Sequence, residues 1–325
     1  MNSPKLIKIL KIGLPLLLGV FLLWLWLGGM SPQDRIDLWE NIKNANPLWI
    51  LISFLFSTLS HISRAYRWKF MLEPMGYKPK LGTSVAALMT GYFANTFVLR
   101  SGEVLRAVAL QKTDKIPFEK AFGTIVSERI ADLIMLLLVM AIAISLQSTE
   151  LISYFGEKAN PIPSIISMLV LITLGVIGLR ILKKSNHPFI VKIRTFGLGI
   201  LEGTKSILKM KKTGAFIFHT LFIWTMYIAM FWVVTLCVPG LHGVSFRVIL
   251  AAFVIGAFSM SATNAGMGLY PIAMAAVFTF FGYSDIDGNT FGGIIWGTQT
   301  LFNLILGGLC AIYTLILSNQ KKIVP

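Results

Sequence analysis

The run NTFVLRSGEVLRA at residues 95–107 places two arginines and a glutamate directly after a stretch of apolar residues. Glu103 lies three residues from both Arg100 and Arg106, so the three side chains share one face if the run is helical. A guanidinium presents a fork of N–H donors that matches a phosphate group. The run therefore fits a site for an anionic group. It also fits an ordinary loop on the basic side of a membrane, and charge alone favours that second interpretation.

A second charged group, SERIADL at residues 127–133, begins a long apolar run. Asp132 lies three residues after Arg129 and four after Glu128, so it can interact with both along a helix. A charged side chain well inside a bilayer is costly unless it is paired or hydrated. We therefore expect the triplet to face the protein interior and to pair with an arginine. The candidate partners are Arg64, Arg67, Arg100 and Arg106. A purely structural ion-pair network fits equally well.

The run RAYRW at residues 64–68 ends an earlier apolar stretch. Basic and aromatic side chains gather where a membrane helix reaches the headgroup region. We interpret Arg64, Arg67 and Trp68 as such an interfacial anchor.

A third polar region, SMSATNAGMGLYP at residues 259–271, interrupts an apolar segment. Small and polar residues at such a place are typical of a turn between two half-helices whose ends face a ligand. This interpretation assigns Asn264, Gly266 and Gly268 to a binding site. A tight crossing of two helices also needs small residues.

The composition identifies the chain as an integral membrane protein. Of its 325 residues, 55% are hydrophobic and 13% are charged, whereas a soluble domain carries roughly 25% charged residues. Its two cysteines and four histidines show no metal-ligand spacing, and no nucleotide loop or catalytic motif is present. We therefore expect no metal and no cofactor. The missing motifs do not exclude an enzyme, which would have to use the charged residues named above, but we expect none.

Apolar runs long enough to cross roughly 30 Å of hydrocarbon predict the spans of an all-α polytopic protein. Six full spans are expected, at residues 12–29, 47–63, 130–148, 162–179, 214–238 and 291–317. Two further apolar regions, 83–99 and 248–282, are interrupted by Gly91, Asn95, Gly266 and Gly268, and we expect re-entrant helical hairpins there. The whole chain, 1–325, then forms a single integral membrane domain.

The two hairpins suggest an inverted repeat. Half A covers residues 47–148 and half B covers residues 214–317, and a span with a basic cytoplasmic segment, 162–212, connects them. The two halves run in opposite directions through the membrane. Inverted repeats with broken helices that meet near the midplane are common in secondary transporters.

The positive residues set the predicted orientation. In this arrangement 25 of the 29 Lys and Arg residues lie on one side, which the positive-inside rule makes cytoplasmic. Both termini are then cytoplasmic, and the protein is a multi-pass protein of the cell (inner) membrane. The net charge of +15 reflects this topology and an affinity for anionic lipid headgroups, so no nucleic-acid partner is expected.

Four segments, which follow one another in the same order as in the family, resemble the flippase-like integral membrane family. This family is also described as the transmembrane domain of lysylphosphatidylglycerol synthase. The segments are RAYRW (64–68), GYFANTFVLRSGEVLRA (91–107), SERIADL (127–133) and NAGMGLY (264–270). Two departures are visible. Val98 and Leu99 stand where the family usually has a proline, and Pro271 stands where a glutamate usually follows the glycine cluster. The first site therefore carries over better than the second.

The resemblance implies a lipid flippase, or a transporter of a phospholipid or lipid-linked phosphate. The soluble aminoacyl-transfer domain of the synthase is expected to be absent, because the chain ends at Pro325, shortly after the last predicted span. The alternatives are a membrane-embedded glycosyltransferase or phosphatase acting on a lipid phosphate, and a membrane scaffold protein.

The candidate substrate-binding residues follow from these segments. They are Asn95, Arg100, Glu103, Arg106, Glu128, Arg129, Asp132, Asn264, Gly266 and Gly268. The expected partners are membrane lipids with anionic or phosphate-bearing headgroups. Gly293 and Gly297, at GxxxG spacing, fit either helix packing within one chain or a homo-oligomer.

Cysteine-accessibility labelling tests the predicted topology. A cysteine introduced at residue 320 is expected to react only with reagents that reach the cytoplasm, because the last residues fall on the basic side. Labelling of this position from outside the cell would contradict the orientation.

Overall fold

The computed structural model describes residues 4–147, 191 and 210–323, and within these ranges every regular element is a helix. The longer helices are α1 (Pro4–Gly28), α2 (Pro32–Asn44), α3 (Pro47–Leu72), α4 (Leu81–Phe97), α5 (Ser101–Asp114), α6 (Phe118–Leu146), α10 (Thr213–Thr235), α11 (Phe246–Ala262), α12 (Leu269–Phe280) and α13 (Asp285–Ile323). Three short 3-10 helices are η1 (Glu73–Met75), η2 (Pro239–Leu241) and η3 (Asn264–Gly266). The predicted all-α fold is confirmed.

Four of the described helices are long and apolar enough to cross a membrane: Pro47–Met75, Phe118–Leu146, Thr213–Thr235 and Asp285–Gln320. They correspond to four of the six predicted spans. The predicted span 12–29 is α1, which joins α2 at an angle of 105°, and the pair can count as a fifth span. The predicted span 162–179 and most of the basic segment 162–212 lie outside the described residues.

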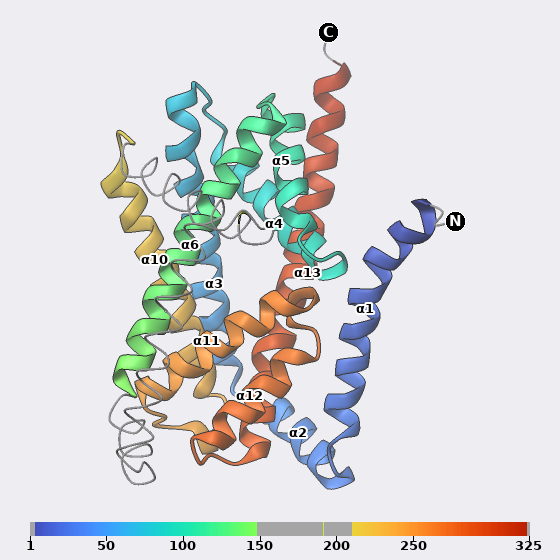
Figure 1. The fold of residues 1–325 in the computed structure, drawn as a ribbon, viewed down its shortest axis with the longest axis vertical. Coiled ribbons are helices and arrows are strands. Elements are labelled where there is room, and N and C mark those ends of the chain that lie inside the picture. Colours follow the sequence, from blue (N-terminus) through green and yellow to red (C-terminus); the bar gives the residue numbers. More distant parts are fainter. Residues whose placement is uncertain (1–3, 148–190, 192–209, 324–325) are drawn as a thin grey trace.

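Figure 1 shows how the chain passes through the molecule. From α3 to α6 it rises, turns back through α4 and α5 in the upper half, and descends. From α10 to α13 it descends, turns back through α11 and α12 in the lower half, and rises. The start of α1 and the end of α13 point toward the same end of the molecule. The inverted repeat remains a prediction.

The first hairpin differs from the predicted one in the place of its break. In the region 83–99, Gly91 and Asn95 can mark either a helix break or a close approach of the backbone, and α4 is continuous from Leu81 to Phe97. The chain turns at residues 98–100 instead, where Arg100 adopts a left-handed conformation (φ 60°, ψ 16°). The returning arm is α5, which lies beyond the predicted region.

Gly91 and Asn95 hold the two arms of this hairpin together. A Cβ atom added at Gly91 would lie 2.9 Å from the carbonyl oxygen of Gly102, and one added at Gly102 would overlap the carbonyl oxygen of Gly91. The Asn95 side chain accepts a hydrogen bond from the Gly102 N–H at 2.7 Å. The two glycines therefore permit a close approach of α4 and α5, because they have no Cβ atom to keep the helices apart.

The second hairpin breaks where the sequence predicts, between α11 and α12. Gly266 and Gly268 both have positive φ, 75° and 71°, and they turn the chain through η3. At Gly268 an added Cβ would overlap the backbone of Leu22 and Leu23 in α1. Asn264 is fully buried, and its side-chain amide donates to the carbonyl oxygen of Phe97 at 3.1 Å. The tips of the two hairpins are therefore in contact.

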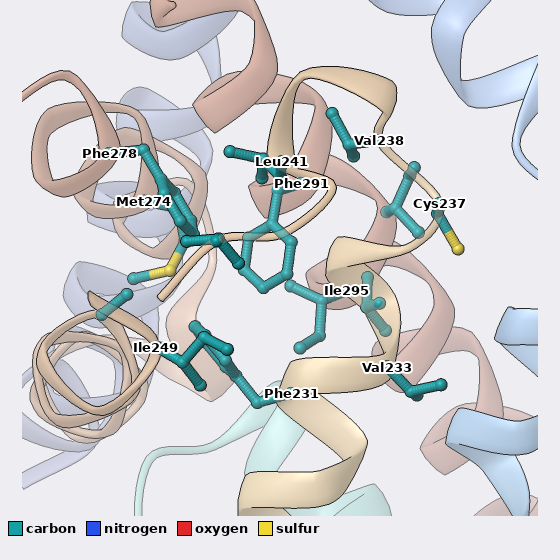
Figure 2. Packing of buried hydrophobic residues seen from close by; sticks show 14 of the residues in the cluster. Phe231, Val233, Cys237, Val238, Leu241, Ile249, Met274, Phe278, Phe291 and Ile295 are labelled. Atoms are coloured by element: carbon teal, nitrogen blue, oxygen red, sulfur yellow. The ribbon is translucent and has the colours of Figure 1, made fainter. Parts of the chain in front are cut away.

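A large apolar cluster anchors the base of the second hairpin (Figure 2). Phe291 on α13 is fully buried, and its ring centroid lies 4.8 Å from that of Phe231 and 5.1 Å from that of Phe278. A second cluster contains Trp68, Leu110 and Ile125 and so joins α3, α5 and α6. The two clusters fix the hairpins to the long helices.

Substitution of Gly102 tests the packing of the first hairpin. In Gly102→Ala the new methyl group overlaps backbone and the Asn95 amide, so we expect a loss of stability of about 1–3 kcal/mol. Thermal unfolding of the purified protein in detergent measures it. Gly123→Ala in α6 is the matched control, because nothing lies within 4 Å of its added Cβ and alanine favours a helix. Equal unfolding temperatures for the two variants would refute this role of Gly102.

Candidate functional site

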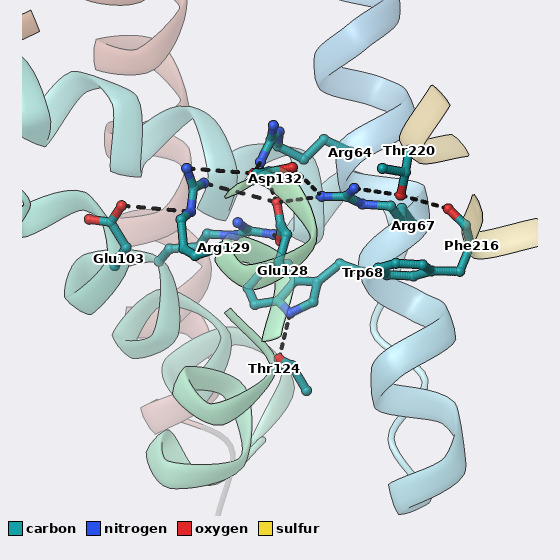
Figure 3. Close-up of polar contacts among 11 residues, drawn as sticks. Arg64, Arg67, Trp68, Glu103, Thr124, Glu128, Arg129, Asp132, Phe216 and Thr220 are labelled. Carbon is teal, nitrogen blue, oxygen red and sulfur yellow. Dashed lines mark hydrogen bonds and ion pairs between the residues drawn. The ribbon is translucent and has the colours of Figure 1, made fainter. Parts of the chain in front are cut away.

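Glu128 on α6 lies at the centre of a buried cluster of charged side chains (Figure 3). Its Oε1 atom is 2.6 Å from Arg64 Nη1 and 3.2 Å from Arg67 Nη2, both on α3. Its Oε2 atom is 2.8 Å from Arg106 Nη2 on α5. Glu128 has no exposed surface. Three guanidinium groups therefore neutralise one carboxylate inside the helix bundle.

Asp132, one helical turn further along α6, shares the two arginines of α3. Its carboxylate oxygens lie 2.7 Å from Arg64 Nη1 and 3.2 Å from Arg67 Nη2. Arg129 makes longer contacts, 3.7 Å to Asp132, 3.9 Å to Glu103 and 4.0 Å to Glu128. Arg129 is thus the most loosely held arginine of the cluster.

The arginines of α3 are not an interfacial anchor, so that interpretation is wrong. Arg64 is 3% exposed, and Arg67 and Trp68 are 0% exposed. The helix continues to Leu72, well past the predicted end of the span at residue 63, and it packs against α10 along its length. The side chains after residue 63 therefore enter the bundle instead of the headgroup region.

Uncharged partners complete the cluster. Arg67 donates to the Thr220 hydroxyl on α10 at 2.7 Å, and Trp68 donates to the Thr124 hydroxyl at 2.7 Å. The guanidinium carbon of Arg106 lies 3.8 Å from the centre of the Trp68 ring, a favourable cation–π geometry. These contacts hold Arg67 and Arg106 firmly behind the two carboxylates.

The predicted site residues fall into three groups. Glu103, Arg106, Glu128, Arg129 and Asp132 are together in the cluster. Asn95, Asn264, Gly266 and Gly268 shape the hairpins and their tips. Arg100 is exposed at the start of α5 and is not among the arginines that pair with Glu128 or Asp132.

The charges of the cluster do not balance. It contains four arginines, Arg64, Arg67, Arg106 and Arg129, and three carboxylates, Glu103, Glu128 and Asp132. Among the described residues the cluster therefore carries an excess of one positive charge. Such an excess inside a membrane protein attracts an anion.

A cavity of about 510 Å³ opens beside the cluster. Arg64, Arg129 and Asp132 line its charged end. Its remaining wall is formed by α3, α4, α10, α11, α13 and the second hairpin tip, and it is largely aromatic and apolar. The Arg129 side chain is 44% exposed, although it lies within the helix bundle, because it faces this space. Its volume is within the usual range for a ligand site.

Sequence reasoning did not assign two of the cavity residues on α3, Ser57 and His61. Ser53, Ser57, His61 and Arg64 are spaced three or four residues apart, and Ser57, His61 and Arg64 line the cavity. This stripe of polar residues in a predicted span was the available signal, since polar side chains within a membrane helix face the bundle interior.

Comparison with known proteins gives consistent matches. A family model described as the lysylphosphatidylglycerol synthase TM region matches residues 12–307. A UPF0104 membrane protein of Methanocaldococcus jannaschii is 32% identical over 27% of this chain and 27% of its own length. A UPF0104 membrane protein of Methanothermobacter thermautotrophicus is 23% identical over 48% of this chain and 44% of its own.

A third relative is the glycosyltransferase AglD of Haloferax volcanii, which is 26% identical over 40% of this chain and 21% of its own length. The chain thus spans less than half the length of each of these three relatives.

Neutralisation of Glu128 tests the ion-pair cluster. In Glu128→Gln three buried guanidiniums lose a shared carboxylate, and we expect a loss of about 3–5 kcal/mol in stability. Chemical or thermal unfolding in detergent measures the change. Glu73→Gln is the control, because Glu73 pairs with the more exposed Lys69 and Lys212 and such pairs contribute about 0–1 kcal/mol.

A double variant tests whether the stability lost in Glu128→Gln comes from the guanidinium of Arg106, which is left without its carboxylate. Arg106→Met in the Glu128→Gln background removes an uncompensated guanidinium and should recover part of the lost stability. Additive losses from the two substitutions would show that Arg106 and Glu128 do not depend on each other.

Proposed function

The chain belongs to the family of the lysylphosphatidylglycerol synthase transmembrane region, and we propose that it moves a lipid with an anionic or phosphate-bearing headgroup across the membrane. One observation carries the proposal. A cavity within the helix bundle is bordered at one end by a cluster that has more arginines than carboxylates.

Arg64 and Arg129 are the proposed phosphate contacts. Both line the cavity, and Arg129 has only long contacts to carboxylates, between 3.7 and 4.0 Å. A phosphate oxygen can replace these contacts with direct hydrogen bonds. Away from bulk water, the attraction between a guanidinium and a phosphate is much stronger than in solution.

Glu128 and Asp132 have a different part in this proposal. They hold Arg64 in place, and they reduce the positive charge of the empty site. When a lipid leaves, Arg129 can return to Asp132 and Glu103, so release does not leave a bare charge in the membrane. A carboxylate near each arginine therefore keeps phosphate binding reversible.

Transport without a chemical step fits these contacts better than catalysis does. Each carboxylate oxygen of Glu128 and of Asp132 lies between 2.6 and 3.2 Å from a guanidinium nitrogen. A carboxylate paired with several arginines is a poor general base. The relative AglD is named a glycosyltransferase, and a membrane-embedded glycosyltransferase or phosphatase is the alternative for this chain.

The hairpins provide a route for the headgroup. Two half-length helices, α4 and α11, end within the bundle, and their tips meet through the Asn264–Phe97 hydrogen bond. Broken helices that meet in this way border the substrate site in many transporters. We propose that this tip contact opens and closes during transport, in a cell membrane with both termini in the cytoplasm.

Lipid translocation in proteoliposomes tests this function. Loss of one charged hydrogen-bond donor at Arg129 costs about 1.5–3 kcal/mol, so Arg129→Ala should slow translocation of an anionic phospholipid by roughly 10-fold to 100-fold. Arg129→Lys keeps the charge but loses the fork, and its rate should be intermediate. Lys120→Ala, an exposed position on the same helix, is the control and should keep the parent rate.

Two further measurements discriminate the alternatives. Arg100→Ala should keep the parent rate if Arg129 is the phosphate contact, and a large loss there would move the site to the start of α5. Mass spectrometry of the lipids after the assay detects hydrolysis or glycosyl transfer. A converted lipid would establish the enzyme alternative in place of transport.

A further inference from the structure

A second part of the cavity wall is polar but uncharged. We define the polar wall as Ser57 and His61 on α3 together with Gln299 and Asn303 on α13, all of which line the cavity. We propose that this wall binds hydroxyl groups, so that the cargo is a phospholipid whose phosphate carries an uncharged polyol or sugar. This inference rests on the proposed function and names the class of headgroup.

Hydrogen bonds within the polar wall fix the state of His61. The Ser57 hydroxyl donates to Gln299 Oε1 at 3.0 Å, so its remaining lone pairs face His61 Nε2 at 3.2 Å. The Nε2 atom must then carry the proton that Ser57 accepts. In the neutral ring, Nδ1 is left as an acceptor. The charged form of the ring is unfavourable because the ring is buried and because Arg64 lies one turn away on the same helix.

Two buried acceptors of this wall lack a donor. Neither His61 Nδ1 nor Asn303 Oδ1 has a hydrogen-bond partner among the described residues, and His61 is only 9% exposed. The indole N–H of Trp224, which also lines the cavity, is a buried donor without a partner. Buried polar atoms are nearly always satisfied, so a ligand group that both donates and accepts hydrogen bonds fits this wall.

A hydroxyl group meets this requirement, and the common amine headgroups do not. A trimethylated ammonium has no donor, and a primary ammonium has no acceptor for Trp224. Either cation would also enter a cavity whose charged end has an excess positive charge. The arginine end selects a phosphate, and the polar wall selects the hydroxyls attached to it.

The experiment compares headgroups in the same proteoliposomes with the full chain. Acyl-labelled phosphatidylglycerol carries two hydroxyls, phosphatidic acid carries none beyond the phosphate, and phosphatidylethanolamine carries an ammonium. Because a single hydrogen bond contributes about 0.5–1.5 kcal/mol, the parent protein should move phosphatidylglycerol roughly 2-fold to 10-fold faster than either other lipid.

Variants of the polar wall should remove the preference for phosphatidylglycerol and leave the translocation of phosphatidic acid unchanged. His61→Phe keeps an aromatic ring against Tyr92, whose ring centre lies 4.7 Å away, and Asn303→Leu keeps the volume of the side chain. Each should slow phosphatidylglycerol about 5-fold while leaving phosphatidic acid near the parent rate. Thr298→Val on α13 is the control, because Thr298 bonds to its own helix and does not line the cavity, so both lipids should keep their rates.

A binding measurement keeps this inference separate from the proposed function. Calorimetry on the purified protein should show tighter binding of glycerol 3-phosphate than of inorganic phosphate or phosphoethanolamine, and His61→Phe should abolish the difference. Selective binding without translocation of any lipid would overturn the proposed function and leave the hydroxyl site standing. Translocation with equal rates for the three lipids, or equal binding of the three ligands, would overturn the hydroxyl site.

Discussion

The pairing of Glu128 with arginines from two other helices determines how α3, α5 and α6 are arranged. A carboxylate without exposed surface is unfavourable in a membrane protein unless cations surround it. Arg64 and Arg67 come from α3 and Arg106 from α5, so the three helices must stay in register for the contacts of 2.6–3.2 Å to form. The cluster thereby positions the returning arm of the first hairpin and the charged end of the cavity together.

The same cluster combines a rigid part with a loosely held one. Arg67 and Arg106 are buried. Arg67 donates a hydrogen bond to Thr220, and Arg106 stacks on the Trp68 ring. Arg129, by contrast, faces the cavity and has contacts of 3.7 Å or more. A binding group needs a fixed support and freedom to exchange partners. The buried ion pairs supply such a support, and in the proposed function the one arginine in excess is the group that meets the ligand.

Sequence reasoning found the features that depend on local pattern. The apolar runs gave the described long helices, and the cost of unpaired charge correctly predicted that Glu128 and Asp132 pair with arginines. It failed where a residue's role depends on distant segments. Gly91 can mark either a helix break or a close approach of the backbone, and composition cannot separate these two uses of glycine. The structure shows the close approach, to Gly102. Arg64 and Arg67 were interpreted as an anchor because their burial depends on α6 and α10, which follow much later in the chain.

The spacing of the ion pairs along the chain has a consequence for biosynthesis. Arg64 is synthesised 64 residues before Glu128 and 68 residues before Asp132. Until α6 emerges, the C-terminal part of α3 holds two cations without their carboxylates, and long basic side chains in that situation reach toward the headgroups. We therefore expect α3 to settle at its final depth only when α6 arrives. Insertion of α3 would then be a two-step event, completed by a helix made later, and the assembly of the cavity would depend on the order of translation.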